Sequence, residues 1–176
     1  MEFDYIIQTE DSSDHWKFFN VKDHVVLDLG CGRWYTEQFD EFSPIYFGNQ
    51  GARLVIGIDS SEDEILYFNQ ATVGNPKYIF EHVNILATKD ILDLLQKYPT
   101  ISALKCDIEG HERVLLNLNA GDLQTVSELA IEYHNKELNE LFTKKVVEWG
   151  FNIKLNASMT TNEDRMGVLF CNRGQS

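Results

Sequence analysis

Carboxylate and imidazole side chains gather in two short stretches of the sequence, residues 107–112 and 132–134. The first stretch reads Asp-Ile-Glu-Gly-His-Glu, the second reads Glu-Tyr-His, and each follows a run of apolar residues. An imidazole with an ordinary pKa of about 6.5 can take a proton from a reacting hydroxyl group. His111 is therefore the first candidate for a general base, His134 is the second, and Asp107 is a candidate to orient the reacting groups.

The same two stretches supply groups that bind divalent cations. Side chains alternate along a strand, so Lys105 and Asp107 share one face of the first run, while Glu132 and His134 project together from the second. Oxygen ligands combined with imidazole suit Mg²⁺ or Mn²⁺, either of which would polarise a substrate hydroxyl. The alternative is that these carboxylates only cap helices and pair with basic side chains. The candidate metal ligands are Asp107, Glu109, His111, Glu132 and His134.

A glycine turn marks a second place where a ligand can bind. Residues 25–29 form a mostly apolar run that leads into Gly30 and Gly32. Glycine has no Cβ, so the backbone at these positions can approach a ligand closely. A second apolar run, residues 53–59, ends in Asp59, whose carboxylate can accept hydrogen bonds from both hydroxyls of a nucleoside ribose. The two features together predict a site for a nucleoside cofactor.

Two cofactor classes use this geometry, and the spacing favours one of them. The fingerprint of a nicotinamide dinucleotide site requires a third glycine three positions after the second, where this chain has Tyr35. Asp59 also lies further beyond the turn than the roughly 20 residues of that fingerprint. S-adenosylmethionine carries no phosphate and needs only close backbone approach, an acid for the ribose and a flat apolar slot for adenine. The sequence therefore favours S-adenosylmethionine.

Alternating strands and helices must position these residues. The pattern predicts an α/β fold of the Rossmann-like, doubly wound type, with a mostly parallel sheet, helices on both faces and a final antiparallel hairpin. Ligands of such sheets bind beyond the carboxyl ends of the strands, and the candidate residues all lie there. Helices are expected between the strands, including one through residues 114–118. The predicted strands span residues 25–29, 53–59, 78–83, 102–107, 126–134, 151–155 and 166–171.

Length, composition and charge limit the number of domains and the classes of partner that we expect. The 176 residues, of which 43% are hydrophobic, suffice for one domain with one core. We expect residues 1–22 to form an N-terminal arm or lid and residues 23–176 to form the Rossmann-like core. The net charge of −13 disfavours nucleic acids and anionic membranes as partners. Without a signal-peptide pattern, a membrane-length apolar run or disulfide spacing, a cytoplasmic location is expected.

Three blocks of the sequence together resemble class I S-adenosylmethionine-dependent methyltransferases. They are residues 26–32, 55–59 and 104–112, and they follow one another in the order of that family. The third block, Leu-Lys-Cys-Asp-Ile-Glu-Gly-His-Glu, is similar to the K-x-D-x-E-G-x-E signature of the FkbM branch. The resemblance implies a seven-stranded sheet of order 3-2-1-4-5-7-6. It also implies O-methylation of a hydroxyl group on a small sugar-like or secondary-metabolite acceptor.

The resemblance further implies the residues of the cofactor site. Asp28 would line the methionine pocket with the two glycines, Asp59 would hold the ribose, and Asn84 would border the adenine. Asp107 would lie beneath the transferring methyl group. Trp34 stands where many members of the family have a third glycine, and its aromatic face suits a cationic sulfonium. The implied cofactor-binding residues are Asp28, Gly30, Gly32, Trp34, Asp59, Ser60, Asn84 and Asp107.

Two other functions fit parts of the same pattern. A methyltransferase-like module that only binds or scaffolds would explain the short chain and the lack of an insert for substrate recognition. A nicotinamide-dependent oxidoreductase would also use the glycine turn, although Tyr35 disfavours it. The response of the protein to each cofactor distinguishes these functions.

Overall fold

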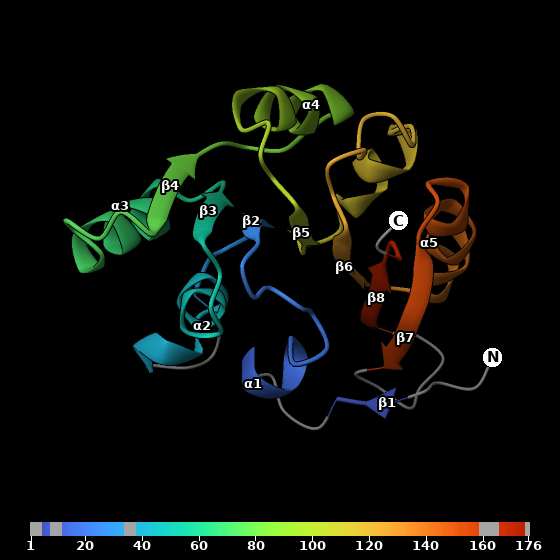
Figure 1. The fold of residues 1–176 in the computed structure, drawn as a ribbon, viewed down its shortest axis with the longest axis horizontal. Coiled ribbons are helices and arrows are strands. Elements are labelled where there is room, and N and C mark those ends of the chain that lie inside the picture. The colour runs from blue at the N-terminus through green and yellow to red at the C-terminus, as the bar shows by residue number, and fades with distance from the viewer. Residues whose placement is uncertain (1–4, 8–11, 34–37, 159–165, 175–176) are drawn as a thin grey trace.

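The chain folds around an eight-stranded, mostly parallel sheet with helices on both faces (Figure 1). The computed structural model describes residues 5–7, 12–33, 38–158 and 166–174. The strand order is β1-β7-β8-β6-β5-β2-β3-β4, and β8 runs antiparallel to its two neighbours, β6 and β7. The strands are β1 (Tyr5–Ile6), β2 (Val25–Leu29), β3 (Leu54–Asp59), β4 (Tyr78–His82), β5 (Ala103–Cys106), β6 (Glu128–Tyr133), β7 (Asn152–Ser158) and β8 (Gly167–Asn172).

Seven of these strands confirm the predicted fold class. Numbered from β2 onward, they have the order 3-2-1-4-5-7-6, with the last strand antiparallel. The eighth strand, β1, was missed. It extends the edge of the sheet by pairing in parallel with β7, so that Tyr5 lies opposite Ala157. Trp16 and Phe19 from the same N-terminal segment are buried in the core, so the described part of this segment packs against the sheet.

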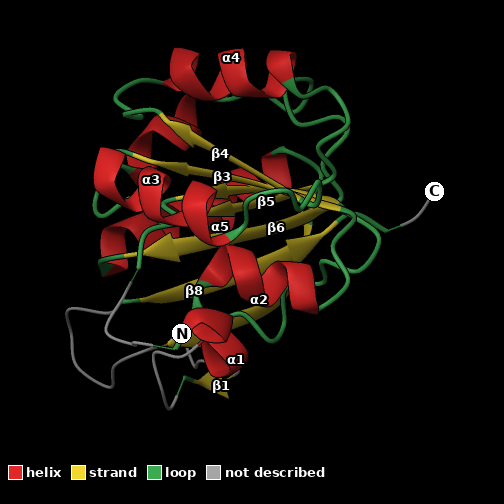
Figure 2. Cartoon of the chain, turned by 90° about the vertical axis from the view of Figure 1, so that its left-hand side faces the viewer, coloured by secondary structure: helices red, strands yellow, loops and turns green. Residues whose placement is uncertain are grey.

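Helices cover the two faces of the sheet in separate groups (Figure 2). Val25 and Leu27 of β2 face one group, whereas Val26 between them faces the other, because side chains alternate along a strand. The first group comprises α4 (Thr88–Lys97), the 3-10 helix η2 (Glu112–Asn117) and α5 (Lys136–Glu148). The second comprises α1 (Ser12–His15), α2 (Ser43–Asn49) and α3 (Glu62–Ala71), and the short 3-10 helix η1 (Phe39–Glu41) precedes α2.

Local sequence explains where the helices nearest the strand ends begin. The Ser61 hydroxyl accepts a hydrogen bond from the backbone N–H of Glu64 and caps α3. The helix predicted through residues 114–118 is the 3-10 helix η2 rather than an α-helix. Leu115 in η2 and Leu118 directly after it are three positions apart, and the three-residue turn of a 3-10 helix directs both toward the core.

Two sequence predictions about the whole chain can be compared with this fold. The three cysteines are buried and free, as their positions in or beside apolar runs predicted. Within the described ranges, the structure contains no helix with the length and apolar character needed to cross a membrane.

Candidate cofactor and active site

The turn after β2 lies directly against the end of β5. Gly30 has a φ of +77°, and a Cβ at this position would lie 1.6 Å from the backbone oxygen of Asp107. The N–H of Gly30 donates to the carbonyl of Ile58 at 2.9 Å, and the N–H of Asp107 donates to the carbonyl of Leu29 at 3.0 Å. Only glycine therefore fits at position 30. Its small size allows the carboxyl ends of β2, β3 and β5 to lie against one another.

Gly32 leaves space beside the carboxylate of Asp59. A Cβ on Gly32 would lie 2.9 Å from Oδ2 of Asp59. The other oxygen, Oδ1, accepts a hydrogen bond of 2.8 Å from the N–H of Ser61 at the start of α3. Asp59 thus supports the start of α3 with one oxygen and presents its second oxygen to the glycine turn.

An ion pair ties the same turn to α3. The side chain of Arg33 donates to both carboxylate oxygens of Glu64, at 2.8 and 2.9 Å, and its backbone N–H donates to Oε2 at 3.0 Å. The guanidinium also lies 4.1 Å from the ring centroid of Tyr67. The spacing of Arg33 and Glu64 in the sequence did not indicate this link.

Of the other predicted cofactor-binding residues near this turn, two are exposed and one lies outside the described residues. Ser60 is exposed, and its carbonyl lies 3.0 Å from Nε2 of His82. Asn84 is exposed in the loop that follows β4. Trp34 lies outside the described residues. The assignments of ribose, adenine and sulfonium contacts to these residues remain predictions.

Asp28 has a structural environment that the sequence did not indicate. Its side chain is fully buried, and Oδ2 accepts a hydrogen bond of 2.7 Å from the hydroxyl of Ser43 in the first turn of α2. Its Oδ1 lies 3.0 Å from Nζ of Lys105. In this arrangement the carboxylate contacts two protein groups, and its place in the methionine pocket remains a prediction.

Lys105 is a buried cation that connects Asp28 to the rest of the site. Its ammonium group donates to the carbonyls of Gly30, at 2.6 Å, and Leu29, at 3.3 Å, and lies 3.7 Å from Oδ2 of Asp107. Burial alone would lower the pKa of Lys105, but the two carboxylates raise it above its ordinary value, so the group is charged. The sequence placed Lys105 near Asp107 but gave no sign of its contact with Asp28.

Asp107 and Glu132 are buried acids at the carboxyl ends of β5 and β6. Burial raises the pKa of Asp107 to about 7, and the negative charge of Glu132 adds to this effect. Burial likewise raises the pKa of Glu132 to about 7. Both groups therefore change charge near neutral pH.

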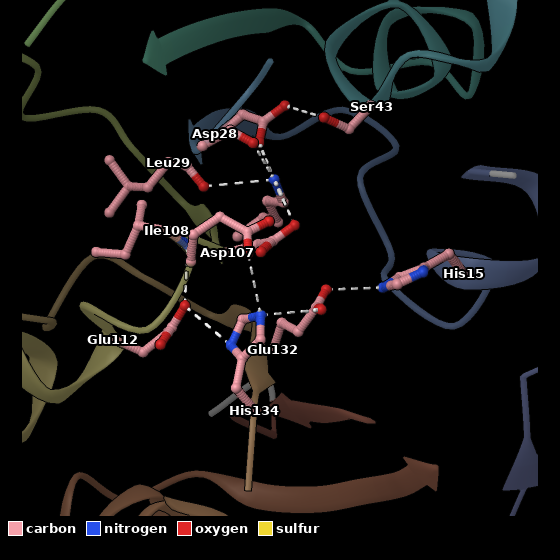
Figure 3. A network of polar contacts seen from close by, with 12 residues as sticks. His15, Asp28, Leu29, Ser43, Asp107, Ile108, Glu112, Glu132 and His134 are labelled. Atoms are coloured by element: carbon pink, nitrogen blue, oxygen red, sulfur yellow. Dashed lines mark hydrogen bonds and ion pairs between the residues drawn. The ribbon is translucent and has the colours of Figure 1, made fainter. Parts of the chain in front are cut away.

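His134 lies among three glutamates, of which Figure 3 labels Glu112 and Glu132. Its Nδ1 is 3.3 Å from Oε1 of Glu112, and its Nε2 is 3.6 Å from both Glu109 and Glu132. The contact with Glu112 is the main reason that the pKa of His134 rises to about 9. Burial alone would raise the pKa of Glu112, but His134 and the surrounding backbone N–H groups lower it below its ordinary value.

The structure brings together most, but not all, of the predicted catalytic and metal-binding residues. Asp107 and His134 converge with Glu112, which was not among the candidate ligands. His111 is exposed at the start of η2 and does not belong to this group. The cause lies in the loop between β5 and η2, where Glu109 (φ +53°) and Gly110 (φ +89°) have left-handed backbone conformations. Strand alternation ends there, so His111 turns outward and Glu112 turns inward.

The N-terminal segment reaches the same site. Nε2 of His15 lies 3.0 Å from Oε2 of Glu132, and both side chains are buried. Glu132 therefore lies between His15 on one side and His134 on the other (Figure 3). The described part of the predicted arm thus contributes a side chain to the edge of the candidate active site.

Comparison with known proteins identifies the fold. No protein-family model and no curated protein sequence matches the chain. Magnesium protoporphyrin IX methyltransferase from Synechocystis PCC 6803, solved with bound SAH, superposes with a TM-score of 0.60 at 17% identity, over 88% of this chain and 76% of that chain. The chain has the Rossmann-like methyltransferase fold. Membership of the FkbM branch remains a prediction.

Two further solved structures show the same fold in proteins of different specificity. Ribosomal protein L11 methylase from Lactobacillus delbrueckii subsp. bulgaricus has a TM-score of 0.56 and 16% identity, over 88% of this chain and 72% of that one. Fibrillarin from Aeropyrum pernix, solved with S-adenosyl-L-methionine, has a TM-score of 0.57 and 10% identity, over 86% and 68% of the two chains. These similarities establish the fold and leave the acceptor of this chain to be argued from its own residues.

Proposed function

We propose that this chain is an S-adenosylmethionine-dependent methyltransferase that methylates a hydroxyl group of a small, sugar-like or secondary-metabolite acceptor. The observation that carries the proposal is the space beside Gly32, which a Cβ would fill and which Oδ2 of Asp59 borders. An acceptor oxygen at the end of the second core strand suits ribose hydroxyls, and a glycine backbone lets the methionine part approach closely. Structures of this fold that hold SAH or S-adenosylmethionine support the choice of cofactor.

The cofactor would supply a methyl group on a sulfonium, and the residues of the chain would bind and orient the two reactants. Asp59 would accept the ribose hydroxyls, while Asn84 would border the adenine. The acidic groups around Asp107 favour a cationic ligand, and their burial keeps water from the reacting atoms. A poorly acidic sugar hydroxyl would need to lose a proton, for which His111 is the first candidate and His134 the second.

The acceptor class follows from charge and from the buried acidic site. A net charge of −13 disfavours long-range attraction of RNA or DNA, whose phosphates carry the same sign. A small neutral acceptor meets no such repulsion. We therefore favour a hydroxylated small molecule over a nucleic acid, although other proteins with this fold include a ribosomal protein methylase.

Ligand binding tests the choice of cofactor. The purified chain should be stabilised by S-adenosylmethionine and SAH in a thermal-shift panel, and not by NAD or NADP. A ligand present at about 100 times its dissociation constant adds about 2.7 kcal/mol to the unfolding free energy, which is readily measured. Lack of response to both adenosyl compounds at saturating concentration would overturn the proposal, as would a response to NAD alone.

A matched pair of variants tests the site. Asp59→Asn keeps an oxygen that can accept from the N–H of Ser61 but removes the charge. Asp63→Asn removes one negative charge from an exposed position in the first turn of the same helix. Calorimetric titration with SAH should show at least about tenfold weaker binding for Asp59→Asn, a loss of about 1.4 kcal/mol, and unchanged binding for Asp63→Asn. Equal affinities of the two variants for SAH would show that Asp59 does not contribute to cofactor binding.

A further inference from the structure

Three side chains, one after β5, one at the start of η2 and one after β6, present buried metal-ligand atoms to one another (Figure 3). Asp107, Glu112 and His134 each offer one ligand atom, and these atoms all lie within 4.8 Å of one another. Oδ1 of Asp107, Oε2 of Glu112 and both ring nitrogens of His134 are buried and accept or donate no hydrogen bond among the described residues. The ring nitrogens of His134 have only the ion-pair contacts with glutamates at 3.3 and 3.6 Å. Buried polar atoms are normally hydrogen-bonded, so this group has unused capacity for a further partner.

The backbone holds Glu112 with one oxygen bound and the other free. Its Oε1 accepts hydrogen bonds from the N–H groups of Ile108, at 3.1 Å, and Gly110, at 3.0 Å. The side chain is completely buried, and Oε2 remains without a hydrogen bond among the described residues. The positive φ at Gly110 gives the loop the shape that directs both N–H groups toward this carboxylate. The free oxygen therefore has a fixed position.

Asp107 is held in a similar way. Its backbone N–H is bonded to Leu29, and its Oδ2 faces the ammonium of Lys105 at 3.7 Å. Oδ1 has no hydrogen bond within the described chain. Lys105 makes its shorter contacts with Asp28 and the carbonyl of Gly30, so it does not occupy the space between Asp107 and His134.

We propose that Asp107, Glu112 and His134 bind a divalent cation of the Mn²⁺ type. Two carboxylates with one imidazole form a mixed oxygen and nitrogen set that suits Mn²⁺ better than Mg²⁺, which prefers oxygen ligands alone. Glu109 and Glu132, each 3.6 Å from Nε2 of His134, add negative charge around the site. A divalent cation balances this charge and satisfies three buried groups at once.

The ligand set differs from the one that the sequence suggested. Glu112 replaces His111, which is exposed, and Glu109, whose side chain is 55% exposed, lies at the rim. A cation at this position would polarise an acceptor hydroxyl as a Lewis acid, and this role rests on the proposed methyltransferase function. The binding of the cation does not depend on that function.

The competing occupant of the site is a proton on His134. A protonated imidazole would pair with Glu112 and partly neutralise the cluster without any metal. The two occupants are distinguished by adding Mn²⁺ to metal-free protein in the absence of S-adenosylmethionine, so that failure of this proposal is separate from failure of the cofactor proposal.

Manganese binding can be measured directly by electron paramagnetic resonance. The chain is first treated with a chelator and exchanged into metal-free buffer, and the signal of free Mn²⁺ is followed during titration. We expect one saturable site per chain, with electron spin echo modulation from one imidazole nitrogen. Absence of saturable binding at millimolar Mn²⁺ would overturn the proposal, as would bound Mn²⁺ without a nitrogen signal. The wild-type protein is sufficient for this test.

Conservative variants test the three ligands. In Glu112→Gln, the amide oxygen can still accept from Ile108 and Gly110, so the loop is retained while the free ligand oxygen becomes an NH₂ group. Asp107→Asn, Glu112→Gln and His134→Gln should each weaken Mn²⁺ binding at least about tenfold. His111→Gln is the matched control and should leave binding unchanged. Equal binding by the ligand variants and the control would assign the cation to the general acidic surface and overturn the site.

Discussion

Nζ of Lys105 lies 3.0 Å from Oδ1 of Asp28, and both side chains are buried beneath the glycine turn. The pair links two neighbouring parallel strands, since Asp28 is directly opposite Lys105 in the register of β2 and β5. Lys105 also binds the carbonyls of Leu29 and Gly30. A buried ion pair thus fixes the position of the backbone that the cofactor would approach.

Removing one partner of this pair should be far more costly than removing both. Lys105→Met leaves Asp28 as an uncompensated buried charge and should reduce the unfolding free energy by about 3–5 kcal/mol. Adding Asp28→Asn to Lys105→Met should restore part of this loss. Urea denaturation of the two single variants and the double variant measures the coupling. Additive effects would contradict the pairing, and Lys89→Met, which removes an exposed lysine, should change stability little.

Glycine can be required at a position either by a positive φ or by close approach of other atoms, and a comparison of Gly30 with Gly74 distinguishes these two reasons. Both have a φ of +77°, but a Cβ at position 30 would meet the oxygen of Asp107, whereas nothing lies within 4 Å at position 74. Gly74→Ala should cost only the conformational strain of about 1–2 kcal/mol. Gly30→Ala should cost at least about 3 kcal/mol, because β2 and β5 must also move apart. Similar denaturation midpoints for the two variants would show that close approach is not important at position 30.

The Arg33–Glu64 pair should make stability depend on pH on the acidic side. The hydrogen bonds from Arg33 hold the pKa of Glu64 below its ordinary value of 4.5. The stabilisation is therefore present above pH 4.5 and is lost as the pH falls through the lower pKa of the folded state. Glu64→Gln should reduce the unfolding free energy by about 0.5–1 kcal/mol at pH 7, with allowance for partial exposure of the pair.

The difference in unfolding free energy between wild type and Glu64→Gln should stay nearly constant from pH 7 to about 5 and shrink as the pH is lowered from 4.5 to 3. Urea denaturation at intervals across this range provides the measurement. A difference that stays constant with pH would show that Glu64 acts through packing alone.

His111 and Asp59 should affect different steps of the proposed reaction. His111 is exposed beyond the end of β5, so His111→Ala should leave the affinity for SAH unchanged. If His111 removes the acceptor proton, its loss should lower turnover about 10²–10⁴-fold, the usual contribution of a general base. Release of SAH with a panel of hydroxylated acceptors measures turnover. Full turnover by His111→Ala would show that another group acts as the general base.

Most of the fold could be predicted because its core strands are continuous apolar runs with acidic or glycine residues at their ends. Val25 to Leu29 and Leu54 to Asp59 are buried on both faces, so their sequences are constrained along their whole length. β1 was missed because two residues at a sheet edge pair through backbone groups that any sequence provides. The helix after β5 was predicted without its 3-10 type, because residues three apart suit both helical periods.

The candidate site was predicted in outline, and its partners were decided by the loops. Asp107, Glu132 and His134 converge because the register of parallel strands β5 and β6 brings their carboxyl ends together. His111 and Glu112 exchange places relative to the prediction, because two left-handed residues end the alternation of side chains after Asp107. The pattern K-x-D-x-E-G-x-E contained Glu112 but did not reveal which of its acids faces inward.

The sequence by itself determined the order of the elements, the glycine turn and the set of acids at the strand ends, because these depend on local composition and spacing. Only the tertiary structure decided that Lys105 pairs with Asp28, that His15 reaches Glu132 and that Glu112 completes the group with Asp107 and His134. Such contacts join residues that are distant in sequence or that follow irregular loops. These contacts depend on strand register and backbone angles, which cannot be predicted from residue types and spacing alone.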